Sequence, residues 1–184
     1  SLADGATLTS GGKPASIAVS TEATGYTTSA DAWSTSAYEA SNGTKYNYAA
    51  WDPATSSDTL VVWLHGAGEG GKSDEIATDP YVTILANKVV ALSEDEFQGI
   101  VGGAHVVAPQ CPTMWMDIDG TKTYITTENS TEVRSYYTES LEEFIDTYAT
   151  KVGATKIVLA GCSNGGFMTL WMGLHRPTAY SAIV

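Results

Sequence analysis

The sequence has few of the residues from which metal and redox sites are built. It holds only two cysteines and three histidines in 184 residues. None of them stands with other ligand-type side chains at the spacing that metal sites use, and no glycine-rich loop ends in Gly-Lys-Ser or Gly-Lys-Thr, as a phosphate loop would. We therefore expect no metal and no cofactor. Cys111 and Cys162 both follow expected strands, which leaves a disulfide and two free buried thiols as open alternatives.

Basic residues are scarce as well. Nine Lys and Arg stand against 21 Asp and Glu, for a net charge of -12. Such a charge repels the phosphates of nucleic acids and anionic lipid surfaces, so neither is an expected partner. The sequence also lacks the run of about 20 apolar residues that a membrane-spanning helix needs, and its first residues lack the pattern of a signal peptide. Few Lys and many Ser, Thr, Tyr and Trp are typical of an exported bacterial protein, secreted or periplasmic.

Alternating strand and helix patterns fill most of the chain. Apolar or alternating runs predict strands at 15–19, 44–50, 59–64, 104–108, 156–160 and from 181 onward. Helical spacing predicts helices at 80–92, across 133–152 and at 167–175, the last apolar nearly all round and therefore expected to be buried. This order predicts an α/β fold, a mostly parallel sheet flanked by helices, in a single domain. Residues 1–43 form an extension with the first strands, and residues 44–184 form the core.

One stretch combines this pattern with a chemical signal. Gly161-Cys-Ser-Asn-Gly-Gly166 lies between the expected strand 156–160 and the expected helix 167–175. A turn this tight between a strand and a helix forces the central serine into a strained conformation and sets its hydroxyl above the sheet edge. Gly161 and Gly165 are the positions where a larger residue would collide with neighbouring backbone. Ser163 is therefore the candidate nucleophile.

Three strand ends together resemble those of the α/β-hydrolase family. They read Leu-His-Gly-Ala-Gly-Glu at 64–69, Ala-Pro-Gln-Cys-Pro at 108–112 with Trp115 beyond, and the serine turn at 161–166. Within this family, the chain is most similar to bacterial esterases and peptidases of the prolyl-oligopeptidase and polyhydroxybutyrate-depolymerase-like type. The resemblance covers about residues 44–184, and the combination of motifs is more specific than any one of them.

The resemblance implies a serine hydrolase that cleaves carboxylic esters through an acyl-enzyme on Ser163, with a small-molecule or polysaccharide-linked ester as the expected substrate. It also implies that the backbone amides of Ala67 and Asn164 form an oxyanion hole, which stabilises the charge on the attacked carbonyl oxygen. Trp115 and Met116 are expected on the wall of the substrate cleft, unless they only cover the sheet edge. A serine peptidase is one alternative. Another is a non-catalytic module that binds a ligand or carbohydrate through exposed aromatic residues such as Trp33, Trp51 and Trp115.

A serine needs a base to remove its proton, and this sequence offers none in a suitable place. No Asp or Glu follows Ser163, and His175 would stand about 18 Å away along the helix axis. His65 belongs to the oxyanion loop, and His105 begins its strand at the opposite end of the sheet. We therefore expect the catalytic acid and histidine to come from a segment missing from this chain. The remaining part of the fold would be a second polypeptide, such as the other half of a cleaved precursor, or a fragment not included here.

Overall fold

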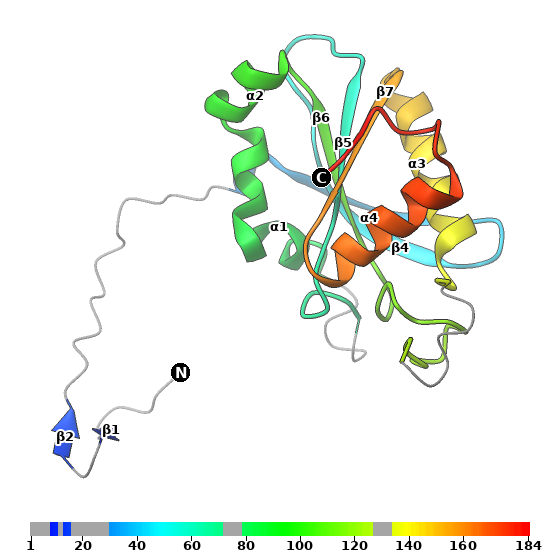
Figure 1. The fold of residues 1–184 in the computed structure, drawn as a ribbon. Helices are drawn as coiled ribbons and strands as arrows, with labels where there is room; N and C mark the ends of the chain where they lie inside the picture. Colours follow the sequence, from blue (N-terminus) through cyan, green and yellow to red (C-terminus); the bar gives the residue numbers. More distant parts are fainter. Residues whose placement is uncertain (1–7, 11–12, 16–29, 72–78, 127–133) are drawn as a thin grey trace.

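The computed structural model describes residues 8–10, 13–15, 30–71, 79–126 and 134–184 (Figure 1). Two short strands near the N-terminus, β1 (Leu8–Ser10) and β2 (Lys13–Ala15), pair in an antiparallel manner. The strand expected at 15–19 lies outside the described residues except for Ala15, which ends β2.

A mixed sheet of six strands forms the centre of the fold. Its strands are β3 (Ser34–Glu39), β4 (Lys45–Trp51), β5 (Thr59–Leu64), β6 (His105–Gln110), β7 (Lys156–Gly161) and β8 (Ala182–Ile183). They are ordered β3-β4-β6-β5-β7-β8 in space. The last four of these strands in the sheet run parallel, and β3 and β4 add an antiparallel hairpin at one edge. The predicted α/β architecture is confirmed.

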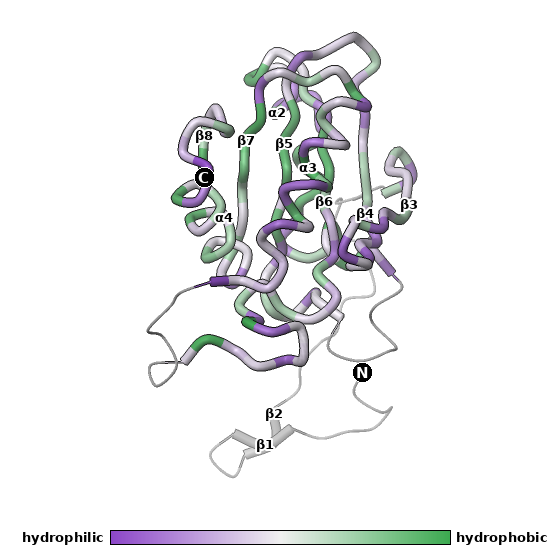
Figure 2. Tube along the Cα trace, turned by 90° about the vertical axis from the view of Figure 1, so that its right-hand side faces the viewer, coloured by the Kyte–Doolittle hydropathy of each residue, from purple (hydrophilic) through white to green (hydrophobic). Residues whose placement is uncertain are grey.

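Helices cover both faces of this sheet (Figure 1). The α-helices are α1 (Val82–Leu85), α2 (Asp95–Val101), α3 (Thr138–Val152) and α4 (Asn164–His175), and the 3-10 segment η2 (Ala86–Ser93) joins α1 to α2. One core cluster places Leu60 and Val62 of β5 against α3 and α4, while Val61 packs in a second cluster with α1 and η2. Figure 2 shows β5 as a hydrophobic stretch of the chain. Because successive side chains of a strand point to opposite faces, this apolar run contributes to both cores.

The helix expected at 80–92 is wrong as a single element. It begins two residues later than expected, at Val82 with Tyr81 as the N-cap residue, although the Asp79 carboxylate accepts a hydrogen bond of 3.0 Å from the Tyr81 amide. Asn87 and Lys88 then adopt the left-handed conformation, with φ of 54° and 56°, and this breaks the helix between α1 and the rest of η2. Helix α2 was not predicted. Its signals are the acidic first turn and Gly102, whose φ of 73° ends it.

The expected burial of α4 is also wrong for one of its faces. Met168 and Met172 are fully buried, but Leu170 is 64% and Leu174 is 78% exposed. The neighbouring strand β8 is exposed too, and Val184 after it is 77% exposed. An apolar face therefore runs along α4 and the β8 edge with nothing among the described residues packed on it.

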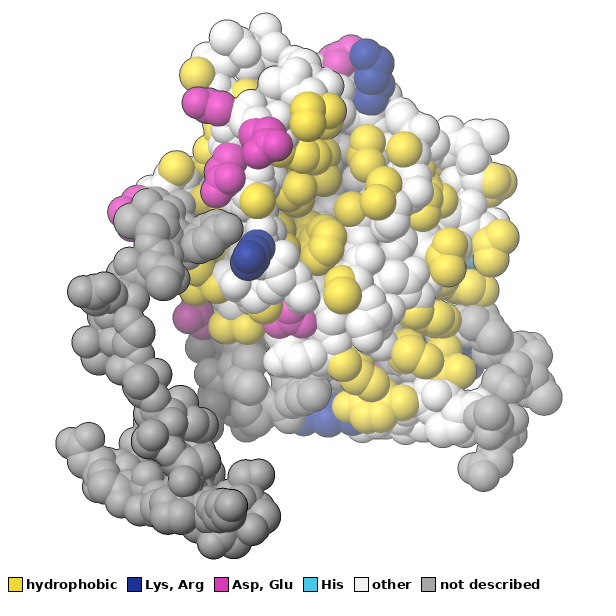
Figure 3. Space-filling model, turned by 60° about the vertical axis from the view of Figure 1, so that its left-hand side comes forward, with side chains coloured by type: hydrophobic (Ala, Val, Ile, Leu, Met, Phe, Trp, Pro, Cys, Tyr) yellow, Lys and Arg dark blue, Asp and Glu magenta, His cyan; other side chains and the backbone are white. Residues whose placement is uncertain are grey.

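The surface shows the scarcity of basic residues that the composition leads one to expect. Figure 3 shows one side of the molecule, on which apolar side chains are common and basic ones rare. Within the described ranges, no helix has both the length and the apolar character that crossing a membrane requires. Cys111 and Cys162 are both free thiols, so the structure has no disulfide between them; Cys111 is buried as expected for a free thiol, whereas Cys162 is half-buried.

Candidate active site

Ser163 sits in a strained turn between β7 and α4. Its φ of 54° and ψ of -112° lie outside the helical and strand regions, and the turn is closed by a 2.8 Å hydrogen bond from the Gly165 amide to the Cys162 carbonyl. A non-glycine residue held in such a region costs about 1–3 kcal/mol, which the surrounding structure must supply. The residue is exposed at the end of the strand. Ser163 is thus a strained and exposed residue in a tight turn between β7 and α4.

The two glycines of the motif are required by close backbone contacts. A Cβ on Gly165 would overlap the carbonyl oxygen of Leu64, and a Cβ on Gly161 would lie 2.5 Å from the carbonyl oxygen of Gly165. Gly166 is different, because the nearest atom to its Cβ would be 3.6 Å away. The packing of α4 against β5 and β7 thus depends on Gly161 and Gly165, and these contacts hold the serine turn in its conformation.

The glycine-rich loop 65–71 begins beside this turn. The parallel register pairs Leu64 of β5 with Gly161 of β7, and the Cys162 amide donates a 3.2 Å hydrogen bond to the Leu64 carbonyl. A Cβ built on Gly66 would lie 3.9 Å from the Cβ of Ser163. Two loops that are a hundred residues apart in the sequence therefore meet at the carboxyl ends of adjacent strands, where open α/β sheets place their ligands.

Two backbone amides in these loops have no partner. Within the described part of the chain, no hydrogen bond joins the N–H of Ala67 or of Asn164 to another residue. Asn164 is itself held firmly, because its buried side-chain oxygen accepts a 2.7 Å hydrogen bond from the Trp115 amide. Unpaired N–H donors on both loops next to an exposed serine are chemically able to stabilise a negatively charged oxygen.

His65 is a structural residue. It is fully buried, and its Nε2 accepts a 2.9 Å hydrogen bond from the Cys111 amide. Since a backbone amide can only donate, Nε2 carries no proton, and Nδ1–H donates to the Gly66 carbonyl at 2.6 Å. Burial lowers the pKa of this imidazole to about 4. His65 is thus neutral near pH 7, with both nitrogens engaged in holding the loop.

The other two histidines pair with carboxylates away from the serine. His105, at the first position of β6, lies 2.6 Å from Asp52, and His175, at the end of α4, lies 2.8 Å from Glu142. The structure therefore brings no histidine of residues 1–184 into hydrogen-bonding contact with Ser163. Among the described residues, no three His, Cys, Asp or Glu side chains come together as a metal site requires.

The aromatic residues expected at the surface lie mostly in the core. Trp115 has no exposed surface; it packs against Tyr46 and His65, and its indole N–H donates a 3.1 Å hydrogen bond to the His65 carbonyl. The structure places it in the core instead of on the wall of a cleft, because the loop 113–117 folds back over β5 and α4. Trp33 is buried as well, whereas Trp51 and Met116 are half-buried.

A buried carboxylate that the sequence analysis missed shapes this loop. Asp117 is fully buried and accepts hydrogen bonds from the Thr113 hydroxyl at 2.6 Å, the Gly120 amide at 3.0 Å and the Lys122 amide at 2.9 Å. Its neighbours in the sequence, Asp119 and Gly120, are typical turn residues and were the available signal. Asp117 positions the segment from which Trp115 reaches Asn164.

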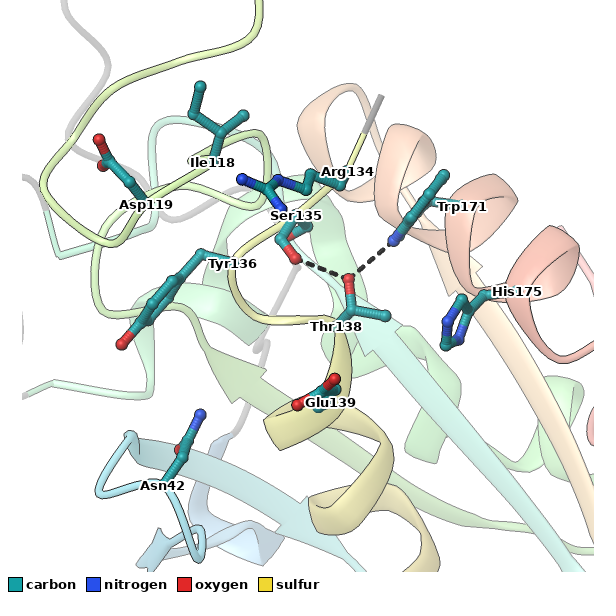
Figure 4. Close-up of a pocket in the computed structure, with 10 residues that line it drawn as sticks. All are labelled: Asn42, Ile118, Asp119, Arg134, Ser135, Tyr136, Thr138, Glu139, Trp171 and His175. Atoms are coloured by element: carbon teal, nitrogen blue, oxygen red, sulfur yellow. Dashed lines mark hydrogen bonds between the residues drawn. The ribbon is translucent and has the colours of Figure 1, made fainter. Parts of the chain in front are cut away.

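A groove of about 840 Å³ lies apart from the serine, between the first turn of α3, the outer part of α4 and the loop 118–120 (Figure 4). Tyr136, Trp171 and His175 contribute rings to it, and Arg134 and Glu139 contribute charges. Trp171 is anchored by a 2.7 Å hydrogen bond from its indole N–H to the Thr138 hydroxyl. The groove offers aromatic surface and polar groups together, a combination that suits small-molecule binding.

This mixed sheet, with a strained serine turn and a glycine-rich loop at its carboxyl edge, is that of the α/β hydrolases. The model of the phospholipase/carboxylesterase family matches residues 48–184, and the chain belongs to this family. A search of curated proteins gives no significant match.

Solved structures of hydrolases share the fold. A thermostable esterase superposes with a TM-score of 0.65 at 23% identity, over 83% of this chain and 40% of its own length. Poly(aspartic acid) hydrolase-1 from Sphingomonas sp. KT-1 superposes with a TM-score of 0.53 at 15% identity, over 82% of this chain and 54% of its own length. The chain thus spans about half of these proteins or less.

Proposed function

We propose that the chain carries the nucleophile and the oxyanion donors of a serine esterase. The observation that supports this most is the conformation of Ser163, a strained and exposed residue fixed by the contacts of Gly161 and Gly165. Proteins retain such strain mainly at functional sites. The membership in a carboxylesterase family favours an ester over a peptide bond as the substrate.

In the proposed reaction, Ser163 Oγ attacks the ester carbonyl carbon while a base removes its proton. The carbonyl oxygen becomes negatively charged and accepts hydrogen bonds from the amides of Ala67 and Asn164. The alcohol leaves with a proton returned by the base, and water then hydrolyses the acyl-enzyme by the same steps. The loss of one such amide donor typically slows a reaction by about 100- to 1000-fold, so the fixed positions of both loops matter.

We further propose that the base and its orienting acid come from polypeptide outside residues 1–184, as a continuation or as a second chain. All three histidines of this chain are engaged elsewhere, and no acidic residue follows Ser163. The bare apolar face of Leu170, Leu174 and Val184 offers a surface on which such a segment would pack. On this proposal, Ser163 is reactive only in the completed protein.

A fluorophosphonate probe tests these roles, because it labels an activated serine covalently. The protein that includes the completing segment should gain one label by intact mass, and Ser163→Ala should gain none. Ser181→Ala, which removes an exposed serine from the turn before β8, is the matched control and should label fully. Labelling of Ser163→Ala at the rate of the unchanged protein would rule out the proposed nucleophile.

The groove in Figure 4 supports a second candidate function, the binding of a carbohydrate without catalysis. Tyr136 is 44% exposed, and its ring lies against the backbone of Gly120, so it presents a rigid surface to the groove. Arg134 and Glu139, both exposed, supply hydrogen-bonding groups beside it. If this candidate is right, the completed protein binds neutral oligosaccharides in calorimetry, loses binding in Tyr136→Ala, and is not labelled by the fluorophosphonate.

A further inference from the structure

Glu69 is held in the glycine-rich loop by contacts on several sides. Its side chain is only 8% exposed, and its Oε1 accepts a 2.9 Å hydrogen bond from the side-chain amide of Asn87. Its backbone carbonyl accepts a second bond of 2.9 Å from the Gln110 side chain. A buried carboxylate needs such partners, because the loss of water is otherwise costly. The contacts tie the loop to η2 and to the end of β6.

The partner of this carboxylate has an unusual backbone. Asn87 adopts a φ of 54° and, with Lys88, interrupts a helix that the sequence pattern alone would continue. Asn is among the few residues other than Gly that tolerate this left-handed conformation. The break directs the amide of Asn87 to Glu69. The hydrogen bond to Glu69 therefore gives a reason for the left-handed conformation of Asn87, which an uninterrupted helix would not contain.

The contact lies directly behind the reacting centre. Glu69 Oε2 would be 3.2 Å from a Cβ built on Gly66, and that same position is 3.9 Å from the Ser163 Cβ. The neutral His65 also lies beside the carboxylate, with its Nδ1 4.0 Å from Oε2. Ala67, with its unpaired amide, lies in the segment between Gly66 and Glu69. Any shift of Glu69 therefore moves the proposed oxyanion donor.

We propose that Glu69 and Asn87 are positioning residues for the reaction at Ser163. Through their hydrogen bond they hold the loop 65–71 so that the Ala67 amide faces the carbonyl oxygen of the substrate. This inference rests on the proposed function. Donors that are fixed before the reaction stabilise the transition state without reorganisation, and a displacement of about 1 Å can cost about 100-fold in rate.

Asn87→Gly tests this role, because Gly accepts the left-handed backbone and lacks only the side-chain amide. In the completed, active protein, we expect kcat to fall about 10- to 100-fold while KM changes less than about threefold. Glu69→Ala removes the same bond and should lower kcat by a similar factor. The double variant should be no slower than the slower single variant, because the two residues act through one contact.

The kinetics of these variants and of Ser163→Ala separate the possibilities. A kcat for Asn87→Gly within twofold of the unchanged protein would overturn the positioning role, and so would independent, multiplying effects in the double variant. Thermal unfolding of each variant, with kinetics measured well below the midpoint, shows that a loss of kcat is not a loss of folded protein. If Ser163→Ala keeps full activity, the proposed function fails; if Ser163→Ala is inactive and Asn87→Gly is normal, only the positioning role fails.

Discussion

His65 shows how burial converts a titratable residue into part of a scaffold. The motif Leu-His-Gly-Ala-Gly-Glu offers a histidine beside the serine, which by proximity alone could be a base. Its two nitrogens instead bind the Cys111 amide and the Gly66 carbonyl, and burial lowers its pKa to about 4. Only a neutral ring satisfies both contacts, because a protonated Nε2 cannot accept a hydrogen bond.

This shift predicts a loss of stability in acid. Between about pH 6.5 and pH 4 the unfolded chain binds a proton at His65 that the folded chain does not, so the free energy of unfolding falls as the pH is lowered through this range. The loss contributed by His65 amounts to about 3 kcal/mol. Urea unfolding at several pH values measures it. His65→Gln, which keeps one donor and one acceptor, should flatten the dependence; an unchanged slope in that variant would contradict the assignment.

At the scale of elements, the contact between the serine turn and β5 leaves no space for a side chain at Gly165. Gly165 faces the Leu64 carbonyl at the start of α4, whereas a Cβ on Gly166, one residue later, would lie at an ordinary contact distance of 3.6 Å from the Gly161 carbonyl oxygen. Gly165→Ala should therefore destabilise the fold by about 3 kcal/mol and reduce labelling of Ser163, because the turn must shift. Gly166→Ala is the matched control, and it should be neutral or stabilising by up to about 1 kcal/mol because Ala favours a helix. Chemical denaturation of both variants makes the comparison; equal losses would contradict the steric argument.

At the scale of the whole molecule, the apolar face of α4 and β8 should govern association. Leu170 and Leu174 lie four residues apart on one side of α4, and the β8 edge beside them leaves strand backbone open to pairing. Residues 1–184 alone should therefore self-associate as concentration rises, which sedimentation velocity measures. Leu170→Glu with Leu174→Glu should shift the material toward monomer. Ile100→Glu, at an equally exposed site on α2, is the control and should not; an equal shift would refute a specific role for this face.

Most strands of the sheet, the helix across 133–152 and the strained turn at Ser163 could be predicted from the sequence, because they depend on local patterns, whereas helix α2 was missed. Continuous apolar runs mark strands buried on both faces, and a serine between glycines in a strand-to-helix turn has few alternative conformations. The break at Asn87 could not be predicted, since its cause is a contact with Glu69, 18 residues away. The burial of Trp115 could not be predicted either, because a loop residue is exposed or buried according to where the loop folds back.

The exposed face of α4 shows the same difference between a local sequence pattern and long-range packing, at a larger scale. Its composition is that of a buried helix, and hydrophobicity states only that such a face needs a partner. Which part of the chain covers it is a matter of long-range packing, and in this structure Met168 and Met172 are covered while Leu170 and Leu174 are not. The local sequence thus determines which residues form the strained turn and its strands. Contacts between distant segments determine which side chains hold the loop 65–71 in place. Those contacts exist only once the sheet has brought the segments together, so the sequence pattern does not reveal them.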